Sequence, residues 1–144
     1  MANSDTIHLL QECDAGSKMA VTSLDEVLDS VSDETMLELL TESKKHHEEF
    51  GNDLHEMLNK QGTDEKEPSP IAKGMSWIKT NVKIGMDGRD KTIADLIVDG
   101  CDMGIKSLFK YLNQYPTADE SAKKVCKRLI SIEDELRRKL YDYL

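Results

Sequence analysis

Apolar residues recur every three or four positions along most of the chain, the spacing of one face of an α-helix. Two such stretches cover about residues 5–30 and 33–60, and a third covers about 90–113. A fourth follows the Tyr-Pro-Thr turn at 115–117. Since no stretch shows the strict alternation of a β-strand, the pattern predicts an all-α protein with four long amphipathic helices. The residues predicted to be most buried are Leu40, Phe50, Ile97, Leu108, Leu129 and Leu136.

Polar residues at the ends of these stretches support the helix boundaries. Ser4 or Asp5 can cap the first helix, and the Ser32-Asp33 pair can cap the second. Gln61-Gly62 follows the second helix, where glycine commonly ends a helix. The long connection from about 61 to 90 begins with a polar, proline-containing stretch and continues with apolar residues at helical spacing.

Two short connections and one long, partly helical crossover predict a single four-helix-bundle domain over residues 1–144. The predicted parts are a first helical hairpin at about 5–60, the crossover at 61–90 and a second hairpin at about 91–144.

The two hairpins share a sequence pattern. The hexapeptide CDAGSK (13–18) returns as CDMGIK (101–106), and residues 33–54 align with 119–140 without a gap. Charged and apolar positions both match, which favours an internal repeat over coincidence. The repeat predicts that helices one and three occupy equivalent places, with the two hexapeptide cysteines in one layer of the core.

Two further stretches complete a resemblance to a known family. GMSWIKTNVK (74–83) lies in the crossover, and DGCDMGIKSL (99–108) lies on the third helix. Together with the order of elements, they make the chain similar to an uncharacterised group of bacterial ferritin-like four-helix proteins. The resemblance implies an up-down-down-up bundle. It covers nearly the whole chain.

Metal-binding members of the ferritin-like superfamily place a glutamate on the first and third helices and Glu-x-x-His on the second and fourth. The corresponding inward positions here are Cys13, Cys101 and the pair Ser43 and His46, and no Glu-x-x-His occurs in the chain. The resemblance, with this departure, predicts no di-iron site, no ferroxidase or oxygenase chemistry and no catalytic residues.

The same departure suggests a different metal. Cys13, Cys101 and His46 are expected to converge on one layer, and two thiolates with an imidazole suit zinc or copper(I). The preferred alternative is that the cysteines pack as small apolar residues, because an apolar core raises a thiol's pKa and disfavours the thiolate. Leu129 and Ile132 are expected to provide that environment.

Several acidic residues near mid-height are predicted to lie on helix flanks or outer faces, as solvated carboxylates usually do. Among them, Glu49 and Glu133 are secondary metal-ligand candidates, since a shift of one residue in helical phase would turn them inward. His46 and His47 are about 100° apart on the helix, so only one of them can point fully inward.

Composition narrows the range of partners and locations. The net charge of −9 argues against nucleic acid and against an anionic membrane surface. The N-terminal residues show no signal peptide, and no apolar run approaches the roughly 18 residues of a membrane span. Three cysteines without C-x-x-C spacing are typical of reduced thiols in a cytoplasmic protein.

Neither a nucleophile motif nor a glycine-rich phosphate loop is present, so the sequence offers no positive evidence for an enzyme. The preferred interpretation is a non-catalytic bundle that serves as a structural, interaction or stress-related module, as a homodimer and without a cofactor. The alternatives are a residual metal-binding protein or degenerate metalloenzyme, and a protein that binds a small molecule between its helices.

Overall fold

The computed structural model describes residues 3–63 and 90–144, and both stretches are helical. The elements are α1 (Ser4–Leu28), α2 (Glu34–Lys60), α5 (Asp90–Gln114), α6 (Glu120–Leu140) and the short 3-10 helix η1 (Tyr141–Tyr143). Neither described stretch contains a strand, which confirms the all-helical prediction. Apart from its two ends, the predicted crossover at 61–90 lies outside the described residues.

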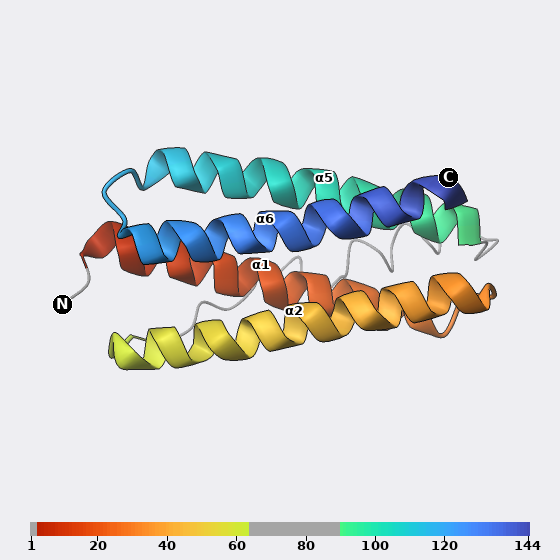
Figure 1. The fold of residues 1–144 in the computed structure, drawn as a ribbon, viewed down its shortest axis with the longest axis horizontal. Coiled ribbons are helices and arrows are strands. Elements are labelled where there is room, and N and C mark those ends of the chain that lie inside the picture. The colour runs from red at the N-terminus through yellow and green to blue at the C-terminus, as the bar shows by residue number, and fades with distance from the viewer. Residues whose placement is uncertain (1–2, 64–89) are drawn as a thin grey trace.

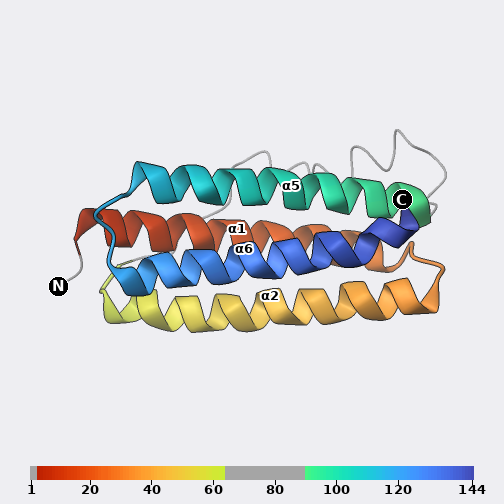
Figure 2. The same cartoon turned by 45° about the horizontal axis from the view of Figure 1, so that its top comes forward.

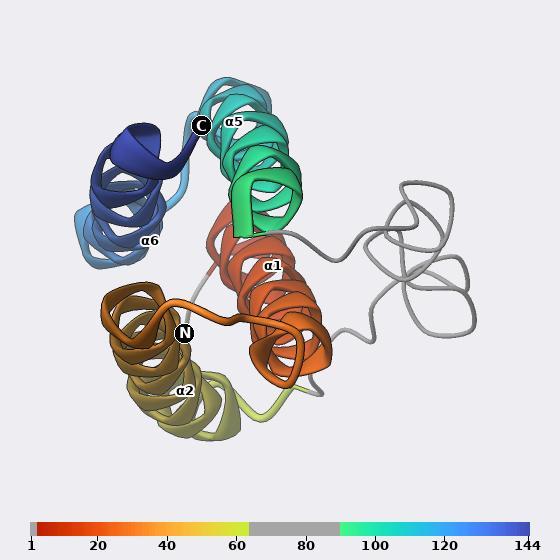
Figure 3. The same ribbon diagram turned by 90° about the vertical axis from the view of Figure 1, so that its right-hand side faces the viewer.

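The four long helices pack side by side as a bundle. Helices α1 and α6 run in one direction along it, and α2 and α5 run in the other (Figure 1, Figure 2). Seen from the end, α5 lies beside α1 and α6 lies beside α2 (Figure 3). Each consecutive pair, α1 with α2 and α5 with α6, therefore forms an antiparallel hairpin.

Local hydrogen bonds explain where the helices of the first hairpin begin and end. The Asp33 carboxylate accepts from the backbone N–H of Met36 at 2.8 Å, which confirms the predicted cap of α2. Gly62 follows α2 with φ of 69°, a left-handed conformation that favours glycine. The cap of α1 is Asn3, which accepts from Thr6 N at 2.8 Å, and neither Ser4 nor Asp5 as predicted.

Side chains also tie the two hairpins together at both ends of the bundle. At one end, the Asp90 carboxylate accepts from the backbone N–H groups of Ser32 and Asp33, each at 2.8 Å. At the other end, Asp5 Oδ2 accepts from the backbone N–H of Thr117 at 3.0 Å and from its hydroxyl at 2.6 Å. These contacts limit sliding of one hairpin along the other.

The core consists of two separate apolar clusters, and all six residues predicted to be most buried belong to them. Their exposed fractions do not exceed 4%. The upper cluster, named for the end where α1 finishes, contains Leu24, Val27, Met36, Leu40, Ile93, Ala94, Leu96, Ile97, Val98, Cys101, Leu136 and Leu140. The lower cluster contains Leu9, Leu10, Cys13, Phe50, Leu54, Leu58, Leu108, Ala118, Ala122, Cys126 and Leu129.

Membrane insertion finds no support in the described helices. None of them combines the length and the apolar character that crossing a bilayer requires.

Candidate functional site

A layer of polar and small residues separates the two apolar clusters. Each helix contributes to it at the point where its residues pass from one cluster to the other. The contributors are Ser17 from α1, Ser43 and His47 from α2, Gly104 from α5 and Glu133 from α6. Buried polar groups are costly unless they are paired, so this layer is the part of the core that packing alone does not explain.

His47 is at the centre of the layer and is 0% exposed. Its Nδ1 lies 2.8 Å from the backbone carbonyl oxygen of Ser43, one turn earlier on α2. Its Nε2 lies 2.9 Å from Glu133 Oε1 on α6. Since a carbonyl oxygen only accepts, Nδ1 carries a proton and donates it to Ser43. The second proton of the pair is therefore held between Nε2 and the Glu133 carboxyl group.

The environment favours the protonated imidazole. Burial lowers the pKa of His47, but the hydrogen bond and the charge of Glu133, together with the bond to Ser43, raise it by more. The net pKa of His47 lies above its ordinary value. The layer thus contains an imidazolium–carboxylate ion pair that joins α2 to α6.

Two residues of α5 complete the surroundings of Glu133. The thiol of Cys101 donates a hydrogen bond to the carboxylate, and burial with the charge of Glu133 raises the pKa of Cys101. A methyl group at Gly104 would lie 3.6 Å from Glu133 Oε2, so the carboxylate fills the space beside this glycine. Glu133 is therefore enclosed by groups from α2 and α5.

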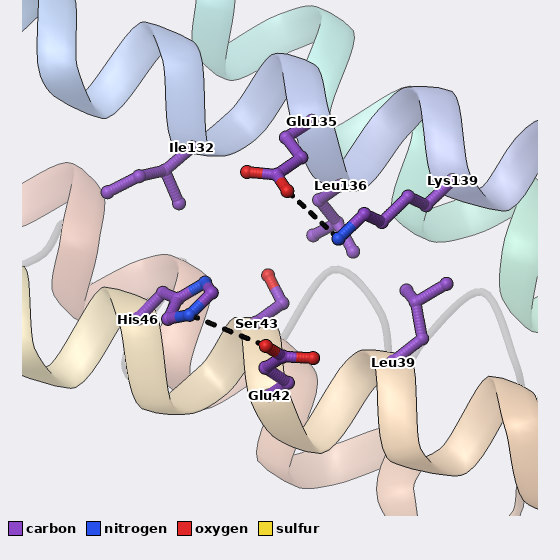
Figure 4. A pocket seen from close by; sticks show the side chains of 8 residues that line it. All are labelled: Leu39, Glu42, Ser43, His46, Ile132, Glu135, Leu136 and Lys139. Carbon is purple, nitrogen blue, oxygen red and sulfur yellow. Dashed lines mark ion pairs between the residues drawn. The ribbon is translucent and has the colours of Figure 1, made fainter.

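A small pocket lies at the surface above the layer, between α2 and α6 (Figure 4). On its rim, Lys139 Nζ pairs with Glu135 at 2.9 Å, and His46 Nε2 lies 3.8 Å from Glu42. Ser43 lines this pocket and also belongs to the polar layer. The His47–Glu133 pair does not line it, so the pair is closed off from this opening.

The prediction that His46 points inward is wrong. The inward histidine is His47, and the His46 side chain is 42% exposed. Alternating steps of four and three residues keep a stripe in line along a helix, and only His47 fits that alternation. The stripe reads Met36, Leu40, Ser43, His47, Phe50 and Leu54. This regular spacing was the sequence signal that would have identified the correct histidine.

The prediction that Cys13, Cys101 and His46 share a layer is also wrong. Cys13 and Cys101 are both buried, as expected, but they lie in different clusters. Cys13 contacts Cys126, whereas Cys101 contacts Glu133. Those two α6 residues are two helical turns apart, about 10 Å along the axis.

The burial of the acidic residues agrees with the prediction at one position and differs from it at others. Glu49 is exposed, in agreement with a solvated carboxylate, but Glu133 is only 7% exposed and Ile132, expected inward, is half-buried. Asp14, another of the acidic residues near mid-height, is also buried, with its Oδ2 2.9 Å from Lys18 Nζ. On α6, Glu133 therefore takes the inward position that was predicted for Ile132, whereas Leu129 and Leu136 are buried as predicted.

Residues 3–63 and 90–144 contain no group of three or more His, Cys, Asp or Glu side chains placed so that they could hold a metal ion. The polar layer comes nearest, since Glu133 contacts both His47 and Cys101. In that layer the thiol and the imidazole each use the carboxylate as a hydrogen-bond partner.

Comparisons of the chain with models of protein families, with curated proteins and with solved structures found no match. The fold and the polar layer are therefore the basis for a functional conclusion.

The raised pKa of His47 predicts a specific pH dependence of stability. Its pKa in the unfolded chain is about 6.5, so the stabilisation is fully present below that pH. It is lost as the pH rises through the higher pKa of the folded state. We expect the unfolding free energy of the wild type, relative to a variant carrying His47→Leu with Glu133→Leu, to fall over this range. Urea unfolding at a series of pH values measures it.

An NMR titration of the histidine rings provides a direct control for this prediction. The His47 signal, identified by its absence in the double variant, should titrate above about pH 6.5. A His47 signal that titrates below this value would contradict the ion pair.

Proposed function

We propose that this chain is a non-catalytic, ferritin-like four-helix bundle that acts as a structural or interaction module. The observation that carries the proposal is the closed polar layer. At mid-height of the bundle, His47 and Glu133 satisfy each other and the neighbouring groups Ser43 and Cys101. Related proteins of this type use that part of the bundle to hold metal.

A closed layer is poorly suited to catalysis or metal binding. A side chain that coordinates a metal needs a free lone pair, and a general base needs a free lone pair that is directed at the substrate. Both ring nitrogens of His47 are already engaged, and the raised pKa of Cys101 keeps its thiol protonated. A metal ion would have to break the His47–Glu133 bond and leave buried charges to be compensated, which is costly.

Two observations support the ferritin-like part of the proposal. The helix directions, with α1 and α6 opposed to α2 and α5, match the up-down-down-up order that the resemblance implies (Figure 1). When residues 33–54 are aligned with 119–140, His47 falls opposite Glu133, so the bonded pair occupies matching places in the two hairpins. This arrangement would result if a duplicated hairpin had exchanged its metal ligands for two side chains that form a hydrogen bond with each other across the bundle.

The outer surface is where such a module would work. Met103 and Phe109 are 59% and 51% exposed on α5. Large apolar side chains at the surface are common in contacts between proteins. The proposal therefore includes self-association as a homodimer.

Metal content tests the proposal. We expect untagged protein from cells supplied with iron, zinc and copper to contain far less than one metal ion per chain. We also expect it to leave the rate of ferrous oxidation at the level of buffer. Elemental analysis by mass spectrometry and an absorbance assay measure these quantities.

The opposite result would identify one of the alternatives. Stoichiometric zinc or copper that is released by Cys13→Ala with Cys101→Ala would support the soft-metal hypothesis. Metal released by His47→Leu with Glu133→Leu would place it in the polar layer. Either result overturns the non-catalytic proposal in its present form.

A further inference from the structure

Two of the three cysteines are in contact across the bundle. Cys13 on α1 and Cys126 on α6 are each 0% exposed and lie in the same apolar cluster, where each thiol shifts the pKa of the other. Cys126 Sγ also lies 3.7 Å from the carbonyl oxygen of Leu108 on α5. Since that oxygen only accepts, the Cys126 thiol donates to it.

The backbone brings α1 and α6 close together at this level. Gly16 is one turn beyond Cys13, and a Cβ atom there would lie 3.8 Å from Leu129 Cδ2. Nearby, Thr6 Oγ1 accepts from the backbone N–H of Asp119 at 2.8 Å, which fixes the start of α6 against α1. Disulfide formation requires such close approach of the two backbones.

Cys101 differs from this pair. It lies in the upper cluster, and its hydrogen-bond partner is Glu133. The chain therefore contains one two-thiol contact and one separate thiol, which makes Cys101 a natural internal control.

We propose that Cys13 and Cys126 form a modification site that is reversibly oxidised to a disulfide by hydrogen peroxide or an organic hydroperoxide. The disulfide would link the α1–α2 hairpin covalently to the α5–α6 hairpin. This site is independent of the proposed function, because it lies in the lower apolar cluster and not in the polar layer.

The two thiols have distinct roles in this reaction. The interaction between the two thiols raises the pKa of Cys13 and lowers the pKa of Cys126, so the proposal assigns the first thiolate to Cys126. The thiolate attacks one peroxide oxygen, the O–O bond breaks, and Cys126 becomes a sulfenic acid. The sulfur of Cys13 then attacks Cys126 Sγ, its proton leaves with the hydroxyl group as water, and the S–S bond forms. In total, two thiols and one hydrogen peroxide give one disulfide and two waters.

Burial determines the rate of the reaction. Because both sulfurs are inaccessible in the closed bundle, oxidation requires α1 to open transiently from α6. We therefore expect slow oxidation in buffer and faster oxidation at urea concentrations below the unfolding transition. A thiol reductant should reduce the disulfide back to two thiols by thiol–disulfide exchange.

Peptide mapping of the wild-type chain tests the proposal. Reduced protein is treated with hydrogen peroxide, the remaining thiols are alkylated, and the protein is digested without reduction. We expect the number of free thiols to fall from three to one, with Cys101 alkylated and one cross-linked peptide pair containing Cys13 and Cys126. Circular dichroism should show that the helices persist.

Matched variants sharpen the test. Cys101→Ala should leave the cross-link unchanged, whereas Cys126→Ala should abolish it and leave Cys13 free. The proposal is overturned if the wild type forms a disulfide that includes Cys101, or a disulfide between two chains. A dithiol peptide treated with the same peroxide, at the same urea concentration, serves as the reference. The proposal is equally overturned if all three thiols of the chain stay reduced under conditions that oxidise this peptide completely.

Discussion

Replacing Glu133 with alanine is expected to lower the unfolding free energy by about 3–5 kcal/mol, the range for removing one partner of a buried ion pair. The variant would leave the protonated His47 in an apolar core with no counter-ion. Part of the loss should be relieved by release of the Nε2 proton, which an NMR titration would detect as a lower pKa of His47. Urea unfolding followed by circular dichroism measures the stability change.

A second variant separates the ion pair from simple packing. His47→Leu with Glu133→Leu removes both charges and keeps an apolar filling, so we expect stability close to that of the wild type, or higher by about 1–4 kcal/mol. The matched control is Glu135→Ala, which breaks only the exposed pair with Lys139 and should cost less than about 1 kcal/mol. Equal losses for Glu133→Ala and Glu135→Ala would contradict the burial of the pair.

Truncating Phe50 to alanine should destabilise the bundle by about 3–5 kcal/mol, as in other large-to-small core substitutions. Phe50 is 1% exposed in the lower cluster. The Arg128 guanidinium lies 5.4 Å from the centre of its ring, so the variant also removes a cation–π contact. Chemical unfolding of both proteins under the same conditions measures the difference.

The adjacent residue provides the control for this prediction. Glu49→Ala changes an exposed side chain on the same turn of α2 and should alter stability by less than about 0.5 kcal/mol. Arg128→Met keeps an apolar stem over the ring and removes the charge, and with it the exposed ion pair to Asp53 at 3.0 Å, which is worth less than about 1 kcal/mol. A loss below about 0.5 kcal/mol for Phe50→Ala would mean that this face of α2 is not in the core.

Much of the helical structure could be predicted because its causes are local. The spacing of apolar residues marks the buried stripe, and the cap at Asp33 and the turn at Gly62 depend only on neighbouring backbone groups. The predicted ends of α2 therefore agree with the structure, Glu34–Lys60. The first cap was missed because Asn3, Ser4 and Asp5 are all good capping residues and sequence alone does not rank them.

The candidate site was less predictable, even where local information existed. The step of four residues from Ser43 to His47 marks His47 as the inward histidine. On α6, the run from Leu129 through Glu133 to Leu136 has the same steps of four and three. Because a charged residue usually lies on the solvent-facing side of a helix, Glu133 was nevertheless predicted to lie on a flank. Burial of Glu133 becomes understandable only when its partner is known.

By itself, the sequence determined four amphipathic helices, their approximate ends and the apolar residues that bury their inner faces. Only the tertiary structure decided which residues meet. Helical periodicity defines the face of each helix that turns inward, but it contains no information on how far one helix is displaced along another. That displacement depends on packing and on end contacts such as Asp5 with Thr117. It brings His47 to Glu133 across 86 residues and separates Cys13 from Cys101, which the repeat had placed together.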